Sequence, residues 1–238
     1  GGQTALMLEV LLKNSIPDET SSLLSQEYRG WIKSITTLSA PLNGSTLVPI
    51  MMDIFPFVHN LAPWFGGIEI EKIDNFYNFD LEHWGVERNP GEPLLKYYKR
   101  ISTSPLAVSH NICSWDLSPK GAAEFNKKYK TDPDVYYFSF STYATTQKKK
   151  KRTHKPDSHM SFHLWSTALL IGQYEDALDS SWYENDGICN TISMTNPSGS
   201  IMQIFDGNPQ KGIWQMSGKL HMDHQAIIGH HITNREHE

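Results

Sequence analysis

The segment Trp182-Tyr183-Glu184-Asn185-Asp186-Gly187-Ile188-Cys189-Asn190 places a carboxylate in a turn between aromatic and apolar residues. Asp-Gly is a common turn dipeptide, so Asp186 alone is compatible with a purely structural role. His224 lies further on, in a second turn that follows an apolar run. A carboxylate that bonds one imidazole nitrogen fixes the tautomer, so that the other nitrogen can take a proton from a hydroxyl. The pair therefore predicts a catalytic acid and base, and Asp223, which as a sequence neighbour rarely faces the histidine, is the weaker acid.

Hydrophobic periodicity and turn residues predict that helices and strands alternate through much of the chain. The expected fold class is α/β, with a mostly parallel sheet and helices on its faces. No internal repeat is visible in the sequence. The expected helices cover residues 1–14, 93–102 and 116–126, and the expected strands cover residues 31–38 and 134–142.

The length suits one large domain or one and a half ordinary ones, and residues 1–238 are taken as one domain. With 238 residues and 39% hydrophobic content, the chain can bury a substantial core. A formal net charge of -5 gives no general attraction to nucleic acid, so no nucleic-acid partner is expected. No apolar run is long enough to predict a transmembrane segment. Cys113 and Cys189 are too few for a disulfide framework and are expected to be small buried hydrophobes.

Residues 46–65 form an unusually apolar segment with one acid and no Lys or Arg. Three prolines interrupt it, so we expect short helical pieces rather than one straight helix. The segment is either buried core or part of a lid over residues 46–80, which would cover a site in water and expose an apolar face at a lipid surface. The candidate substrate contacts are Leu42, Phe55, Phe57 and Trp64.

Residues 144–160 are expected to form an exposed basic loop, because Lys148 to Arg152 is an unbroken run of cations. Such a block repels itself and is usually solvated, although it could also meet an anionic lipid surface or a nucleic acid. His159 and His163 are one helical turn apart, a spacing that a metal site could use. No zinc signature surrounds them, so this remains a weak candidate.

Several segments of the chain resemble, in the same order, blocks of one protein family. Gly-Gly-Gln-Thr at residues 1–4 is similar to the second half of a Gly/Ala-His-Ser-x-Gly-Gly-Gln-Thr nucleophile elbow. Residues 182–194 are similar to Trp-x-Glu-Asn-Asp-Gly-Ile-Val-Asn-Thr-Val-Ser-Met. Further matches are residues 34–45, residues 81–92, Gly212-Ile213-Trp214 and Asp223-His224. The family is that of the large secreted lipases of Gram-positive bacteria, of the staphylococcal and thermophilic-bacillus type.

The resemblance implies an α/β-hydrolase-like sheet with helices on both faces, an inserted helical lid, and N-terminal strands that this chain lacks. It also implies a secreted serine carboxylic-ester hydrolase, a triacylglycerol lipase that meets its lipid substrate at the lipid-water interface. Asp186 corresponds to the catalytic acid and His224 to the catalytic histidine. The nucleophilic serine would be the second residue before Gly1, so the chain alone is expected to be inactive. The alternative is a catalytically inactive relative that binds lipid or acts as a scaffold.

The resemblance also suggests zinc and calcium, but with altered ligands. The family's zinc site uses an aspartate where this sequence has Asn111, a neutral amide and a poorer ligand, and His110 is the nearby candidate. The family's calcium site draws carboxylates from just after the catalytic histidine, where this sequence has Ala226 and His231. No calcium is therefore expected there. No cofactor is predicted, and Asn111 and His110 are the zinc candidates.

Overall fold

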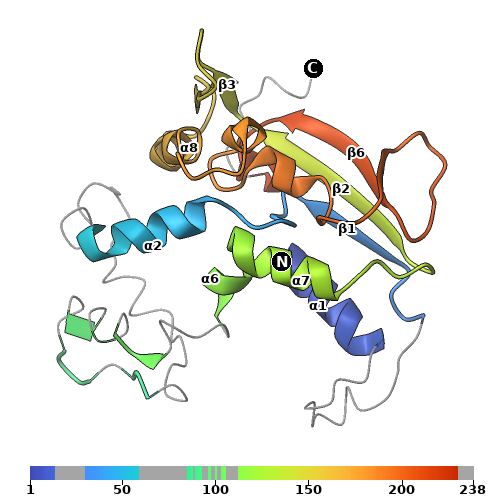
Figure 1. Cartoon of the computed structure of the whole chain (residues 1–238), viewed down its shortest axis with the longest axis horizontal. Coiled ribbons are helices and arrows are strands. Elements are labelled where there is room, and N and C mark those ends of the chain that lie inside the picture. Colours follow the sequence, from blue (N-terminus) through green and yellow to red (C-terminus); the bar gives the residue numbers. More distant parts are fainter. Residues whose placement is uncertain are drawn as a thin grey trace.

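A central sheet of four parallel strands organises the computed structural model (Figure 1). Its strand order is β1-β2-β6-β5, and each neighbouring pair is parallel. The strands are β1 (Ser34–Leu38), β2 (Tyr136–Tyr143), β6 (Trp214–His221) and β5 (Met202–Ile204). The chain therefore has an α/β fold, and β1 and β2 occur where the sequence predicted strands. The structure describes residues 1–13, 30–58, 85–87, 89–92, 96–97, 100, 103–105 and 112–229. Within residues 30–58, side chains are described only as far as residue 52.

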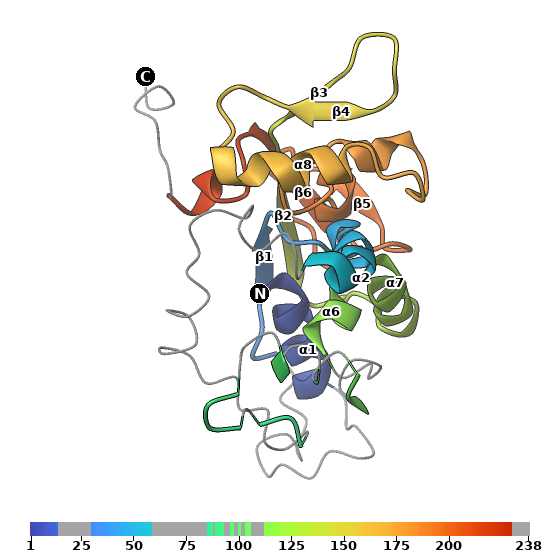
Figure 2. The ribbon, with the colours of Figure 1, turned by 90° about the vertical axis from the view of Figure 1, so that its left-hand side faces the viewer.

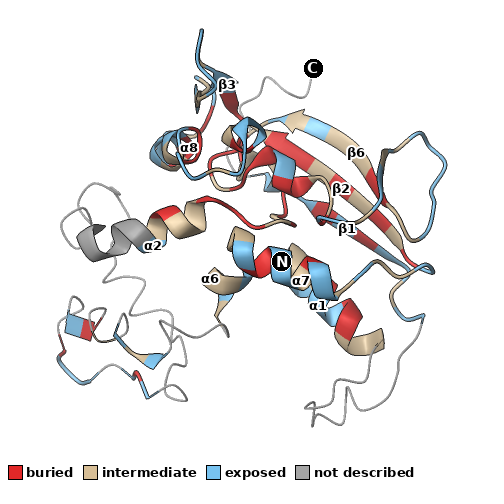
Figure 3. Cartoon of the chain, viewed as in Figure 1, coloured by how far each residue is buried: buried red, intermediate tan, exposed pale blue. Residues whose placement is uncertain are grey.

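Two helices, α1 (Gly2–Lys13) and α7 (Pro119–Lys128), lie on one face of this sheet (Figures 1 and 2). They cover the buried side chains of β1 and β2, which alternate with more exposed ones (Figure 3). Among the described residues the opposite face is only partly covered, since Phe138 and Phe140 keep intermediate exposure. Within the residues that the structure describes, these helices cover one face, and helices on the other face stay a prediction. The core consists of Leu6, Ile35, Ala40, Leu42, Val135, Tyr137 and Trp214.

Glu9 is a buried carboxyl group within this packing. The Tyr137 hydroxyl donates a hydrogen bond to Oε1 of Glu9. Burial raises the pKa of Glu9 above its ordinary value, although the bond from Tyr137 opposes the shift. A carboxyl group with a raised pKa stabilises the fold fully only below its unfolded value, and that contribution is lost as the pH rises through the folded value. Glu9 therefore contributes less to stability at neutral pH than below its ordinary pKa of 4.5.

Glu9→Gln is expected to stabilise the protein at pH 7, because the amide keeps an acceptor for Tyr137 without a buried charge. A gain of about 1 kcal/mol would raise Tm by about 2 to 4 °C for a domain of this size. Thermal unfolding of both proteins at pH 7 and pH 4 checks this. The difference should shrink at pH 4, below the ordinary pKa of 4.5. An equal difference at both pH values would contradict the assignment.

The apolar segment begins as a single helix, α2 (Leu47–Val58). Pro49 and Pro56 both lie inside it, so the expectation that each proline breaks the helix was wrong for these two. Pro49 is tolerated because it lies in the first turn, where backbone N–H groups have no intrahelical acceptor. The helix contacts α8 (Trp165–Ile171). The remainder of the expected lid, after residue 58, lies outside the described residues.

Helix α7 begins at Ser118-Pro119, within the helix predicted over residues 116–126. The Ser118 hydroxyl accepts a hydrogen bond from the backbone N–H of Gly121 at 3.0 Å, and Pro119 occupies the first helical position. The short helix α6 (Cys113–Asp116) precedes it. Cys113 is exposed, contrary to expectation, whereas Cys189 is buried. Most of residues 93–102, where another helix was expected, lie outside the described residues.

Residues 145–156, within the predicted basic loop, form a hairpin. Strands β3 (Thr145–Gln147) and β4 (His154–Pro156) pair antiparallel, and the exposed lysines occupy their connection (Figure 2). The apolar run after this hairpin is amphipathic. Leu164 is buried, whereas Phe162 is 85% exposed and Trp165 is 41% exposed.

No described helix is long and apolar enough to cross a membrane. Four short 3-10 helices complete the described part of the chain. They are η2 (Phe162–Leu164), η3 (Ser180–Tyr183), η4 (Thr191–Met194) and η5 (Ala226–Ile228). Of these, η4 packs against β2. This contact brings the turn that carries Asp186 to the carboxyl end of the sheet.

Candidate active site

The Asp186 turn is closed by bonds to its own carboxylate. Oδ1 of Asp186 accepts hydrogen bonds from the backbone N–H groups of Ile188, at 3.0 Å, and Cys189, at 2.8 Å. Gly187 has φ +100°, and a Cβ there would lie 2.9 Å from Cβ of Leu164, so the position favours glycine. The Asp186 side chain is fully buried. The Asp-Gly turn thus presents a fixed carboxylate.

The second carboxylate oxygen of Asp186 connects the turn to β2 and to His224. Oδ2 accepts a hydrogen bond from the Thr142 hydroxyl at 2.6 Å and lies 2.8 Å from Nδ1 of His224. The Thr142 hydroxyl in turn lies 2.7 Å from that of Ser39. Ser39 follows β1, and Thr142 is near the end of β2. The carboxylate is therefore surrounded by donors at the carboxyl end of the parallel sheet.

His224 is positioned by the loop that follows β6. Its backbone N–H donates to the Asp186 carbonyl at 3.0 Å, in addition to the side-chain bond. Asp223 points elsewhere, because its Oδ2 accepts hydrogen bonds from the backbone N–H and the hydroxyl of Ser161, both at 2.8 Å. The structure thus pairs the imidazole with Asp186 rather than with Asp223. The His224 side chain is 31% exposed, whereas that of Asp186 is 0% exposed.

The environment of His224 favours proton uptake. Burial alone would lower the pKa of the imidazole, but the hydrogen bond and negative charge of Asp186 outweigh it, so the pKa is raised. With Nδ1 bonded to the carboxylate, Nε2 is the nitrogen through which a proton can be exchanged. The pair can therefore act as a general base that becomes a general acid.

The start of α1 lies beside this pair. A Cβ on Gly2 would lie 2.4 Å from Cβ of Ala40, so the helix approaches the residues after β1 closely. The Gln3 amide also donates to the Pro41 carbonyl at 3.1 Å. The opening glycines thus lie at the same end of the sheet as the imidazole.

Leu42 is fully buried in the core, so the structure does not support the expectation that it contacts substrate. The side chains of the other predicted contacts, Phe55, Phe57 and Trp64, lie outside the described residues. A cavity of about 530 Å³ lies at the amino end of the strands, away from His224. It is lined by Glu9, Leu12, Lys13, Gly30, Ile32, Lys33, Asp132, Pro133, Asp134, Val135 and Lys211.

Thr142 and Ser39 are site residues that the sequence did not predict. The signal that could have identified them is their location, since both lie where parallel strands end and functional side chains gather. Of the metal positions considered, His110, Asn111 and His231 lie outside the described residues. The methyl side chain of Ala226 supplies no oxygen ligand, so the described position after His224 does not fit a calcium ion.

Comparisons with known proteins show the family to which the chain belongs. The family model described as "Lipase-like, C-terminal domain" matches residues 1–238. A lipase of Staphylococcus epidermidis is 32% identical over 246 residues, which covers 98% of this chain but only 35% of the relative. The crystal structure of Staphylococcus hyicus lipase has a TM-score of 0.76 and 28% identity, covering 96% of this chain and 61% of that one.

EstA from Clostridium botulinum is a further solved structure with the same architecture. It has a TM-score of 0.80 and 30% identity, covering 96% of this chain and 58% of that one. The chain thus spans about a third of the curated relative and less than two thirds of either solved neighbour. Because the family model matches the whole chain, the resemblance seen in the sequence blocks is confirmed. The chain belongs to the lipase-like C-terminal domain family.

Proposed function

We propose that the full-length protein is a serine carboxylic-ester hydrolase of the lipase class, and that this chain supplies two members of its catalytic triad. The observation that carries the proposal is the 2.8 Å contact between Nδ1 of His224 and Oδ2 of Asp186. The pair lies next to the first residues of α1, where the nucleophile is expected. The names of the relatives, lipase and EstA, support the same reaction class.

In this mechanism the nucleophile is a serine at the second position before Gly1. His224 takes the serine proton through Nε2 as the hydroxyl attacks the ester carbonyl, and Asp186 stabilises the resulting imidazolium. The imidazolium then gives its proton to the leaving alcohol, which departs from the acyl-enzyme. A water molecule, deprotonated by the same imidazole, then attacks the acyl carbon, and the imidazolium returns that proton to the serine oxygen as the acid leaves. The Asp186 turn serves this cycle by holding the carboxylate in one orientation throughout.

The substrate class follows from the apolar surroundings of the site. Helix α2 begins the proposed lid over residues 46–80 and contacts α8 at the carboxyl end of the sheet. On α8 and the turn before it, Phe162 and Trp165 expose apolar surface. A lid and an apolar rim suit long-chain esters at a lipid-water interface. Phe55, Phe57 and Trp64 are the proposed acyl-chain contacts, and secretion is proposed from the likeness to the staphylococcal enzymes.

A serine-directed fluorophosphonate probe tests the reaction class. We expect the full-length protein to be labelled once, on the peptide that precedes Gly1, and to lose ester hydrolysis in step with labelling. Phosphonates react with an activated hydroxyl, so labelling should also fall sharply in His224→Ala. Mass spectrometry of the digested protein locates the adduct. Absence of both labelling and hydrolysis would instead favour an inactive lipid-binding relative.

A further inference from the structure

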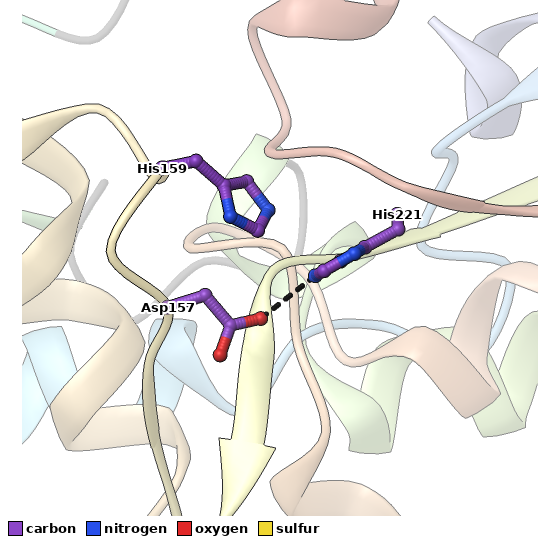
Figure 4. A group of neighbouring side chains, drawn as sticks. All are labelled: Asp157, His159 and His221. Carbon is purple, nitrogen blue, oxygen red and sulfur yellow. Dashed lines mark hydrogen bonds and ion pairs between the residues drawn. The ribbon is translucent and has the colours of Figure 1, made fainter. Parts of the chain in front are cut away.

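Three side chains of metal-binding type converge outside the candidate active site, where the turn after β4 meets the end of β6. Asp157 and His159 follow β4, and His221 is the last residue of β6. One carboxylate oxygen and two imidazole nitrogens from these residues all lie within 4.8 Å of one another. Figure 4 shows the Asp157 carboxylate and the His159 ring directed toward the ring of His221.

Neighbouring residues already orient two of these groups. Nε2 of His221 lies 2.8 Å from Oδ2 of Asp157, and its ring stacks on Tyr143 with centroids 4.6 Å apart and an interplanar angle of 13°. The Thr146 hydroxyl donates a hydrogen bond to the other carboxylate oxygen, and the Asp157 backbone N–H donates to the Ala144 carbonyl at 2.9 Å. Second contacts of this kind orient the ligands of protein metal sites.

The spacing suits a small divalent ion after a modest adjustment. Bonds of about 2.0 to 2.2 Å place tetrahedral ligand atoms about 3.3 to 3.6 Å apart. The His221–Asp157 pair, now at 2.8 Å, would open by about 0.5 Å. The His159 nitrogen, within 4.8 Å of the others, would move inward by at most about 1.5 Å. Because His159 is exposed on a turn, rotation of its side chain can supply that movement.

We propose that Asp157, His159 and His221 form a binding site for a zinc-class divalent cation. Two imidazoles and one carboxylate, without a thiolate, suit Zn²⁺ and its neighbours among the transition metals, whereas Ca²⁺ and Mg²⁺ prefer oxygen ligands alone. The exposure of both imidazoles leaves a further coordination position to water. The site uses neither the Asn111 segment nor the position of Ala226, so it differs from both metal sites that the family resemblance implies.

A bound ion would restrain the segment that leads to His224. His221 and His224 belong to the same short segment, and Asp223 between them already bonds Ser161. Coordination would strengthen the existing contact between His221 and Asp157 and would add His159 to it. The expected consequence is resistance to unfolding that grows with the metal concentration, because the ion binds the folded chain.

The test is a titration of the metal-stripped full-length protein with ZnCl₂, read by calorimetry and by thermal unfolding. We expect one zinc-dependent site and a rise in Tm, with no comparable effect of CaCl₂. Asp157→Asn and His221→Ala should each weaken zinc binding by at least about tenfold and remove the rise in Tm. A wild-type protein that takes up no zinc, or responds equally to calcium, would overturn the proposal.

Two control variants distinguish zinc binding at this site from zinc binding by other histidines. His163→Ala removes an exposed imidazole that bonds Gln225, outside the cluster, and should keep full zinc affinity. His224→Ala should also keep it, although Asp186, Cys189 and His224 form a second group of ligand-type atoms. An equal loss in His163→Ala would indicate adventitious surface binding, and a loss in His224→Ala alone would move the ion to the active site. Either result overturns the proposal.

His159→Ala tests the site in a variant that should fold as the wild type does, so a loss of zinc affinity cannot be due to unfolding. The residue is exposed on a turn, so this variant should match the wild-type Tm without metal while losing zinc affinity. The visible absorption of the Co²⁺-loaded wild-type protein, and its change in the variant, reports imidazole coordination independently of stability and of ester hydrolysis. An unchanged Co²⁺ spectrum in His159→Ala would exclude that imidazole as a ligand and overturn the three-residue site.

Discussion

His224→Ala should lower kcat for ester hydrolysis by the full-length protein by about 10⁶-fold, and Asp186→Asn should lower it by about 10⁴-fold. The first change removes the base itself. The second keeps the buried shape but replaces the acceptor of the Nδ1 proton, now 2.8 Å away, with an amide that can hold the imidazole in the wrong tautomer. Because Asp186 is fully buried, solvent cannot substitute for it.

Hydrolysis of a short-chain chromogenic ester measures both effects without requiring a lipid surface. Asp223→Asn is the matched control, since it removes a carboxylate adjacent to His224 whose bonds go to Ser161 instead. Its kcat should stay within about tenfold of wild type. If Asp223→Asn were as damaging as Asp186→Asn, or if either triad variant kept full turnover, the assignment of the acid and base would be wrong.

The raised pKa of His224 sets the direction of the pH dependence. A base must be neutral to accept the serine proton, so kcat/KM should fall as the pH drops through the pKa of His224. Although burial opposes protonation, Asp186 raises that pKa above the ordinary histidine value of 6.5. The acidic limb of the pH profile is therefore expected above pH 6.5. A limb well below that value would contradict a functional Asp186–His224 contact.

The sequence predicts the catalytic pair because each member lies in a local turn with recognisable neighbours. Asp186 owes its conformation to Gly187 and to the two following backbone N–H groups, all within one short segment. The contact between Thr142 and Ser39 has no such signature. It depends on the parallel pairing of β1 with β2, which brings together residues that are 103 positions apart.

The histidine cluster shows the same difference between local and distant information. Helical spacing suggested that His159 and His163 share a face, but no helix spans both, since η2 begins only at Phe162. His163 bonds Gln225, whereas the ring of His159 lies 4.3 Å from that of His221. The meeting of β4 with the end of β6 determines this grouping, and spacing along the chain cannot reveal it. Similarly, the apolar run that contains Phe162 and Leu164 predicts burial of the segment, but it does not reveal which of its side chains face water.

Thr142→Val should reduce kcat by about 10- to 150-fold, the range expected for losing one hydrogen bond to a charged group, about 1.5 to 3 kcal/mol. The Thr142 hydroxyl proton lies on the 2.6 Å bond to Oδ2 of Asp186, the same oxygen that contacts His224. Valine keeps the shape and removes this donor. Thr142→Ser should restore most of the activity, because it returns the hydroxyl without the methyl group.

The pH profile distinguishes positioning by Thr142 from a general loss of packing. Without this donor, the Asp186 carboxylate keeps more of its charge for the imidazolium, so the pKa of His224 should rise and the acidic limb should move to higher pH. Ser39→Ala is the matched control, because Ser39 contacts the Thr142 hydroxyl at 2.7 Å and leaves the bond to Asp186 intact. It should cause a smaller loss and no shift of the limb. A Thr142→Val enzyme that is slower at every pH by the same factor would show that Thr142 serves only the packing of β2.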